Sequence, residues 1–402
     1  MSDGSLAGYA PDLDSIRGDV ASLSAMRRSS ARAGERASAQ WLLGRLGELG
    51  IGDVERQTYR YQASYALAHG LHNAAGLAAS ALGGPGGAAL AAATLCSYEL
   101  EVGGARQWLR RLLPAGEGAN VIARVPAAGR ARGTLVLVAH HDAANTGLIW
   151  SPRVVAAGGA RHLRRRRVDP FMAQVELALG LAGAGSLLAR RGGTTRALAA
   201  GILGLAALAD ADVARSETVP GACDNASGVA VCIDLLRALA AEPLTDTDVL
   251  VAFTGSEEAG MGGMAAFLDR HGAGLKGGGP AFLLGLDTLG AGTPIVCRAE
   301  GAMREQRYRE RDIALVEEGA AIAGLAAPER WRIGAWTDPI LAVHRGLPSA
   351  SLLSMGPGYF PNYHHPSDTA QRVRWACVTS CARIAAGTIE AFRRCAGALS
   401  WP

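Results

Sequence analysis

The sequence predicts an α/β fold, a three-layer sandwich around a mixed, largely parallel central sheet. Strand-like and helix-like patterns alternate along most of the chain, which is typical of this class. Three apolar runs, at residues 133–142, 247–255 and 281–287, have the length of strands and carry charges only near their ends. Such runs indicate strands buried on both faces, as in parallel sheets. We therefore expect one domain, residues 1–402, built around this sheet.

Other segments complete the expected sandwich. Strands are predicted at 53–62 and 119–126, and shorter ones in IVCRAE, RWRIG and PSASLLSMG. Helices are predicted over 13–50, directly after Asp224, and over about 372–396.

Composition limits the classes of function. Of the 402 residues, 49% are apolar and 19% are charged, which indicates a globular protein with a sizeable core. The net charge of +4 is small for this length and gives no reason to expect a nucleic-acid partner. The seven cysteines are odd in number and lack C-x-x-C spacing, so we expect reduced thiols. Because the first residues also lack the pattern of a signal peptide, a cytoplasmic location is expected.

Two stretches depart from the sandwich pattern, at residues 63–118 and 148–218. Each is predicted to be an insertion of two apolar helices joined by a glycine-rich turn, GGPGG in the first and RRGGTTR in the second. Their lengths are borderline for crossing a bilayer. Two interpretations stay open: hairpins that contact a membrane, with the basic segment RHLRRRR at the headgroups, or hairpins that pack on the domain, on each other or on a second copy.

Histidines and carboxylates recur where the predicted strands end. They are His140 and Asp142, Asp224 before a helix, Glu257 and Glu258, Asp287, and His364 or His365 in NYHHPSDT. In open α/β sheets, sites form at the carboxyl ends of the strands. Each residue alone has a structural explanation, such as a helix N-cap for Asp224. Their joint occurrence, without cysteine, instead predicts a catalytic zinc site.

The order of these motifs resembles the co-catalytic di-zinc exopeptidases, the family that includes bacterial zinc aminopeptidases, glutamate carboxypeptidase and glutaminyl cyclase. The matching pieces are H-x-D at 140–142, GACDNASG, FTGSEEAG, LLGLDTLG and YHHPSDT. The resemblance implies that family's sandwich fold, a peptide substrate and two Zn²⁺ ions per chain.

Residue by residue, the resemblance also implies roles. His140 and Asp287 would bind one zinc, Glu258 and His364 the other, Asp224 would bridge both, Glu257 would be the general base, and Asp142 would hold the His140 ring. His140 is preferred to His141 for its H-x-D spacing, and His364 to His365 because it stands two residues before Pro366.

Three features depart from the family's pattern or stay open. Cys223 stands where many relatives have an acidic residue, and it is either a packing residue or a thiol close to zinc. Tyr359 and Tyr363 lie close to His364 in sequence and either help to stabilise an oxyanion or only pack. The insertion between Asp142 and Asp224 is longer than is usual in the family.

The function that these observations favour is an aminopeptidase that hydrolyses N-terminal peptide bonds. One alternative is a glutaminyl cyclase-like enzyme with a single zinc. Another is a non-catalytic, membrane-associated scaffold on the same fold, although a scaffold has no need of Glu257.

Overall fold

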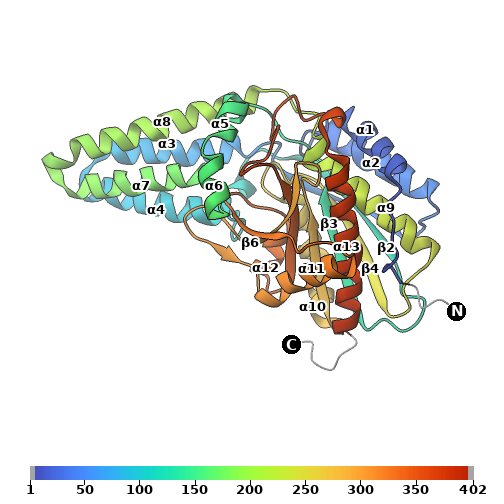
Figure 1. Ribbon diagram of the computed structural model, residues 1–402. Coiled ribbons are helices and arrows are strands. Elements are labelled where there is room, and N and C mark those ends of the chain that lie inside the picture. Colours follow the sequence, from blue (N-terminus) through green and yellow to red (C-terminus); the bar gives the residue numbers. More distant parts are fainter. Residues whose placement is uncertain (1–4, 397–402) are drawn as a thin grey trace.

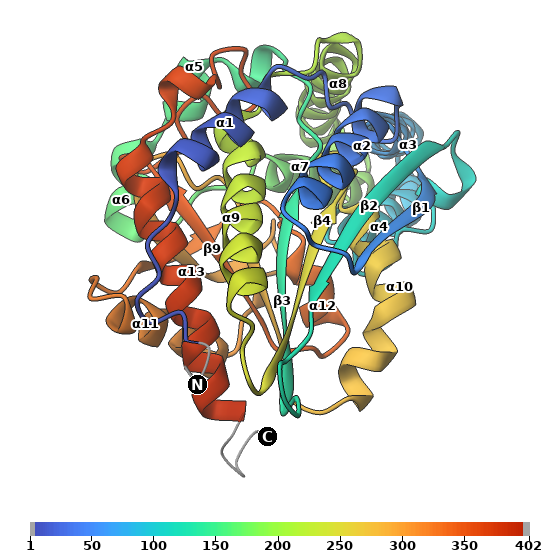
Figure 2. The same cartoon turned by 90° about the vertical axis from the view of Figure 1, so that its right-hand side faces the viewer.

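A computed structural model describes residues 5–396 and confirms the predicted α/β sandwich. Figures 1 and 2 show one central sheet with helices on both faces and a bundle of helices that extends from one end. The described residues form a nine-stranded sheet in the order β1-β2-β4-β3-β5-β9-β6-β7, with β8 paired to β6. The strands are β1 (Val54–Tyr61), β2 (Gly116–Val125), β3 (Gly133–His140), β4 (Thr247–Thr254), β5 (Ala281–Leu286), β6 (Thr293–Glu300), β7 (Gln306–Arg307), β8 (Glu329–Ile333) and β9 (Ser349–Met355).

The centre of the sheet is parallel and its flanks are antiparallel. Strands β4, β3, β5 and β9 run side by side in one direction. On the way outward β1, β2 and β6 pair antiparallel with their neighbours, except that β8 pairs parallel with β6. β5 is buried along its whole length, as its apolar run predicted, and β9 is buried along its whole length as well. Because the four central strands are parallel, their carboxyl ends meet at one edge, where the residues that follow them can gather.

Two helical layers enclose this sheet. One layer contains α1 (Leu13–Ser24), α2 (Ala33–Glu48), α9 (Ser227–Ala241), α11 (Glu310–Ile322) and α13 (Trp375–Ala396). The other contains α10 (Gly262–Gly277) and α12 (Pro339–His344). Short elements are η1 (Arg110–Leu112), η2 (Leu148–Trp150), α5 (Pro152–Ala156), α6 (Gly159–Arg165), η3 (Ala189–Gly192), η4 (Ala222–Ala226) and η5 (Ala370–Arg372).

The helix expected over residues 13–50 is wrong as a single element. The structure divides it into α1 and α2, with a connection at residues 25–32. Ala31 in this connection has a positive φ of 47°, which no helix residue adopts. The side chain of Arg28 is fully buried and bonds to backbone carbonyls beneath the sheet edge. The helix is therefore interrupted at this connection, and the side chains of Arg28 and Ser30 are buried.

The predicted apolar hairpins are present and pack against each other. The first insertion contains α3 (Ala66–Leu82) and α4 (Gly84–Val102), and the second contains α7 (Met172–Leu187) and α8 (Gly193–Arg215). α3 packs on α4 and α8, and α7 packs on α4 and α8, so the four helices form one bundle. In Figure 1 this bundle points away from the sheet, to the left of the view.

One described helix, α8, is long and apolar enough to cross a membrane by length and composition. Only 17% of its most apolar window is buried inside the structure. It is therefore not a core helix of the sandwich.

A buried carboxyl group joins the end of β6 to the segment before α12. Glu300 is fully buried and accepts hydrogen bonds from the N–H and hydroxyl of Thr337 and from the hydroxyl of Tyr308, each at 2.7 Å. Burial raises the pKa of Glu300 to about 7, because the charged form loses its hydration.

We expect this carboxyl group to make stability depend on pH. Between its ordinary pKa of 4.5 and about 7, the folded protein retains a proton that the unfolded chain has lost. The free energy of unfolding should therefore fall as the pH rises through this window, by up to about 3 kcal/mol from this group. In Glu300→Gln the free energy of unfolding should fall less over this pH range, because the titrating carboxyl group is gone. Urea unfolding at pH 5 and pH 7.5 measures it, with the exposed Glu310→Gln as control. Equal pH dependence in Glu300→Gln and in the wild type would contradict the expectation.

Candidate metal centre

The carboxyl edge of the parallel strands carries the predicted site residues. β3 ends at His140, with Asp142 two residues later, and β5 is followed directly by Asp287. Glu257 and Glu258 lie in the turn after β4, and His364 lies in the loop after β9. Asp224 lies at the turn before α9, in η4. The structure brings all seven of these residues together.

Two groups of side chains face one another across Asp224. His140 Nε2 lies 3.3 Å from Asp224 Oδ1 and 3.9 Å from Asp287 Oδ1. On the other side, His364 Nε2 lies 3.3 Å from Asp224 Oδ2 and 3.1 Å from Glu258 Oε2. In each group of three residues the ligand atoms all lie within 4.8 Å of one another. Asp224 thus presents one carboxylate oxygen to each group.

A third group overlaps these two. His140, Glu257 and Glu258 also bring ligand atoms within 4.8 Å of one another. Glu257 therefore lies beside the site, although it is absent from the two groups that share Asp224.

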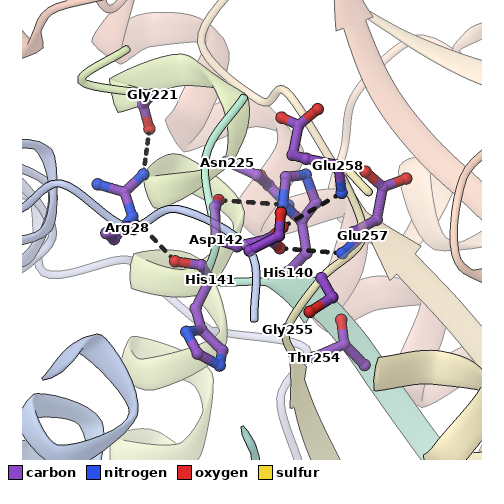
Figure 3. A network of polar contacts seen from close by, with 12 residues as sticks. Arg28, His140, His141, Asp142, Gly221, Asn225, Thr254, Gly255, Glu257 and Glu258 are labelled. Carbon is purple, nitrogen blue, oxygen red and sulfur yellow. Dashed lines mark hydrogen bonds and ion pairs between the residues drawn. The ribbon is translucent and has the colours of Figure 1, made fainter. Parts of the chain in front are cut away.

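The carboxylate of Asp142 ties several parts of the site together. Its Oδ1 lies 3.4 Å from His140 Nδ1 and accepts the N–H of Glu257 at 3.1 Å. Its Oδ2 accepts the N–H of Glu258 at 3.2 Å and the hydroxyl of Ser30 at 2.6 Å. Figure 3 shows Asp142 between the imidazole of His140 and the turn that carries both glutamates. A proton on Nδ1 facing Asp142 leaves the Nε2 lone pair directed at Asp224 and Asp287.

The histidines next to His140 and His364 in the sequence have other partners. His141 is buried, with Nδ1 2.7 Å from the Ser38 hydroxyl and Nε2 2.8 Å from the Ala119 carbonyl. Its ring points away from the carboxylates (Figure 3), and burial lowers its pKa to about 4. His365 is hydrogen-bonded within its own turn, to Ser367. His140 and His364 are thus the histidines placed to act as ligands.

Negative charge is concentrated at this buried edge. Burial raises the pKa of Glu257 well above its usual range and that of Asp287 to about 6. Asp224 behaves differently, because hydrogen bonds from His140 and His364 outweigh its burial and hold its pKa below the usual range. So many carboxyl groups in a dry site are unfavourable without cations among them.

The donor set fits zinc. Each of the two groups that share Asp224 contains one histidine and two carboxylates, the ligand types of catalytic zinc sites. Glu258 Oε1 is buried and has no hydrogen-bond partner among residues 5–396. An unpaired buried carboxylate oxygen at this position is explained by a bound cation.

Several residues that support the site were not predicted. Asp368 accepts the N–H groups of Cys223 and Asp224 at 3.0 Å each and so fixes the bridging residue. Glu35 accepts the N–H and hydroxyl of Ser256, directly before the two glutamates. Arg28, fully buried, donates to the carbonyls of His141 and Gly221 (Figure 3). Asp368 stands in the quoted PSDT motif, whereas the early positions of Arg28 and Glu35 give no signal in the sequence.

Backbone strain also marks the site. Ser256, Thr288 and His364 are non-glycine residues with positive φ of 52°, 50° and 49°. This conformation is costly for such residues and tends to occur at functional sites. Each of the three is a predicted ligand or a direct neighbour of a predicted site residue. The sequence shows no sign of this strain.

Aromatic side chains close one side of the site. The Tyr363 ring stacks on His364 with centroids 3.8 Å apart, and Trp150 meets His364 edge-on at 4.6 Å. Trp150 comes from the long insertion, which therefore takes part in forming the site. These two rings, with Cys223, Tyr359 and the arginines 372 and 374, line a cavity of about 300 Å³. Cys223 belongs to none of the candidate ligand groups found among the described residues.

Comparison with known proteins agrees with this geometry. Residues 206–389 match the model of Peptidase family M28. The predicted resemblance to the co-catalytic zinc exopeptidases is confirmed. The residues matched by the M28 model include Asp224, both glutamates, Asp287 and His364. His140 lies outside the matched residues, and the fold of the chain places it next to Asp224. No curated protein matches the chain.

Solved structures share the fold at low sequence identity. An aminopeptidase from Aneurinibacillus sp. strain AM-1 aligns with a TM-score of 0.57 at 14% identity, over 96% of this chain and 95% of its own. A Zn-dependent exopeptidase from Parabacteroides distasonis gives 0.53 at 12%, over 94% and 97%. The glutaminyl cyclase of Porphyromonas gingivalis gives 0.54 at 16%, over 95% and 98%.

The M28 match and the donor set of the site support a zinc metallopeptidase. The solved structures are less than 25% identical to this chain and therefore establish only the fold.

Loss of the Asp142 charge tests its supporting position. In Asp142→Asn the side chain no longer places a negative charge opposite His140 Nδ1, and it no longer accepts both N–H groups of the turn. We expect zinc affinity to fall about 10–100-fold, the usual effect of removing such a partner. Competition with a chromogenic chelator measures this affinity. Ser30→Ala, which removes only one neutral bond to the same carboxylate, is the control and should change affinity much less.

Proposed function

We propose that this protein is a zinc-dependent aminopeptidase that removes residues from the N-terminus of peptides. The observation that carries the proposal is the pair of ligand groups sharing Asp224, with Glu257 beside them and outside both. In this proposal His140 and Asp287 would hold one zinc, His364 and Glu258 would hold the other, and Asp224 would be a ligand of both. When bound, two zinc ions lower the pKa of a water molecule and polarise a peptide carbonyl.

Glu257 is the general base of the proposed reaction. Its carboxylate takes a proton from the attacking water and delivers it to the leaving amine nitrogen. A base must lie within reach of the water without being occupied as a ligand. Glu257 meets this condition because the turn holds it next to Glu258, with both backbone N–H groups fixed by Asp142. Burial favours proton uptake by Glu257, which suits a group that must accept and release one.

The charge of the site supports an N-terminal amine as the recognised group. Five carboxyl groups gather around two histidines at the sheet edge. Even with two divalent cations bound, this edge can attract the positive charge of a free α-amine. The aminopeptidase from Aneurinibacillus shares the fold over nearly the full length of both chains.

A glutaminyl cyclase-like activity is the second candidate. The glutaminyl cyclase of Porphyromonas gingivalis shares the fold as fully as the exopeptidases do. In that reaction Glu257 would shuttle a proton between the α-amine and the released ammonia. A panel of aminoacyl amides, dipeptides and peptides with N-terminal glutamine separates the two. Release of free amino acids supports the first candidate, whereas pyroglutamyl products without hydrolysis support the second.

Replacing the base should separate chemistry from metal binding. Glu257→Gln removes the proton acceptor but none of the proposed ligands, so two zinc ions per chain should remain while kcat falls by at least about 100-fold. Metal analysis and steady-state kinetics on the same preparation measure both. Activity close to that of the wild type would make the assignment of Glu257 wrong.

Replacing Glu258, the neighbour of Glu257, should instead reduce metal binding. Glu258→Gln removes one carboxylate ligand near His364, so zinc content should drop to about one ion per chain in the presence of a competing chelator. The exposed Glu48→Gln is the control for the loss of one acidic group. Full zinc content in Glu258→Gln would contradict the proposed division between the two glutamates.

A further inference from the structure

We propose that the bundle of α3, α4, α7 and α8 is embedded in a lipid bilayer. The four helices leave the sheet together and extend well beyond it (Figure 1). This inference is independent of the chemistry at the zinc site, because it rests on the surface and the interior of the bundle.

The large exposed apolar side chains of the protein are concentrated at this end. Within residues 5–396, all of them lie on the four helices or on segments close to their base. On the helices they are Leu67, Leu71, Leu82, Leu90, Leu100, Leu177, Leu187, Leu198, Leu205 and Leu208, and Leu188 follows α7. Water-soluble proteins rarely expose a continuous apolar surface of this extent.

Charge is sparse along the sides of the bundle, although the exposed Arg191 stands at its tip. α3 contains no Asp, Glu, Lys or Arg, and α4 contains none before Glu99. The only one in α7 is Glu176, which is buried and accepts the N–H of Met303. α8 has none between Arg196 and Asp210, a length of more than three turns. A helix bundle in water instead carries charged residues on its outward faces.

At the tip of the bundle, small residues make the packing, and the core there consists of Ala79, Ala91, Ala182 and Ala199. Gly87 of α4 lies so close to α7 that an added Cβ would be 3.0 Å from Ser186 Oγ. Nearer the body, the core contains the larger side chains of Tyr98, Val175, Leu179 and Leu203. At the tip, leucines outside and alanines inside reverse the arrangement of a soluble bundle. Close packing through small residues is typical of helices within membranes.

Most of the buried polar side chains of the bundle form internal hydrogen bonds, although Asn73 Oδ1, Glu176 Oε1 and Arg196 Nε have no hydrogen-bond partner among the described residues. Ser80, Thr94 and Ser186 each donate to the carbonyl four residues earlier in their own helix. Between helices, Asn73 donates to Asp210 at 2.8 Å, and His72 Nε2 lies 2.8 Å from the Ser97 hydroxyl. Such internal bonding is required where no water can reach.

The dimensions of the bundle suit a bilayer. At a rise of 1.5 Å per residue, the 17 residues of α3 span about 26 Å, against about 30 Å for a hydrocarbon core. At the base, Figure 1 places α5 and α6 where the bundle leaves the body. Arg153, Arg164 and Arg165 of these helices are exposed and form no ion pair with any described residue. They are available to anionic headgroups.

The occupant is lipid rather than a second copy of the chain. A two-fold partner would cover one side of the bundle, whereas exposed leucines occur on each of the four helices. Hydrocarbon covers every side at once.

Flotation with phosphatidylcholine vesicles tests the proposal on the full chain. We expect the protein to float with the vesicles and to stay bound at high salt, since hydrocarbon burial is not screened by ions. Replacing Leu198, Leu205 and Leu208 by Gln should lower partitioning at least about tenfold. These side chains are 58–70% exposed, so the fold should tolerate the change. The matched control places Gln at the exposed Ala21, Ala321 and Ala376 of the body and should float like the wild type.

A native cysteine reports on insertion. Cys96 on α4 is exposed, while Cys395 is partly exposed and the other described cysteines are buried. With Cys395 replaced by Ser, a water-soluble maleimide should label Cys96 at least about tenfold more slowly in vesicles than in mild denaturant, since the reagent does not enter hydrocarbon. Lys276→Cys on the body, in a Cys96→Ser background, should label equally fast with and without vesicles.

Two outcomes would overturn the proposal. One is a folded protein that stays with the soluble fraction and labels rapidly at Cys96 in the presence of vesicles. The other is a closed oligomer that forms without lipid, protects Cys96 by itself and does not float. In that second case a copy of the chain covers the bundle.

Discussion

The geometry of the site depends on one buried carboxylate. Asp142 lies just beyond the end of β3 and joins that strand to the turn after β4, because its two oxygens accept the N–H groups of Glu257 and Glu258 while it faces the His140 ring. A parallel sheet brings its strand ends near each other but does not orient the loops that follow. Asp142 supplies that orientation. The H-x-D spacing therefore determines how the turn after β4 is oriented as well as how the His140 ring is held.

The parts of the fold and site that could be predicted are those written in local patterns. Continuous apolar runs indicated the central strands β3, β4 and β5, and glycine-rich turns between apolar runs indicated the hairpins. His140 and His364 could be named because motif spacing distinguishes each from its neighbouring histidine. In the structure His141 has only structural partners, which agrees with the choice of His140.

The supporting residues could not be predicted because their partners are distant in sequence. Glu35 holds Ser256 across 221 positions, and Arg28 donates to the Gly221 carbonyl across 193. No local pattern distinguishes these residues from others on an amphipathic helix. The same holds for Trp150, whose contact with His364 exists only because the long insertion folds back over the site. The local pattern predicts helix at 25–32 for the same reason, because the contacts that interrupt the helix there are made to residues distant in sequence.

The helical bundle is rooted at the entrance of the site. Tyr65, directly before α3, and Val213, near the end of α8, line the same small depression as Ser30 and Glu258. The bundle therefore meets the body beside Glu258. A substitution at its base, at Tyr65 or Val213, also alters the surroundings of a proposed zinc ligand.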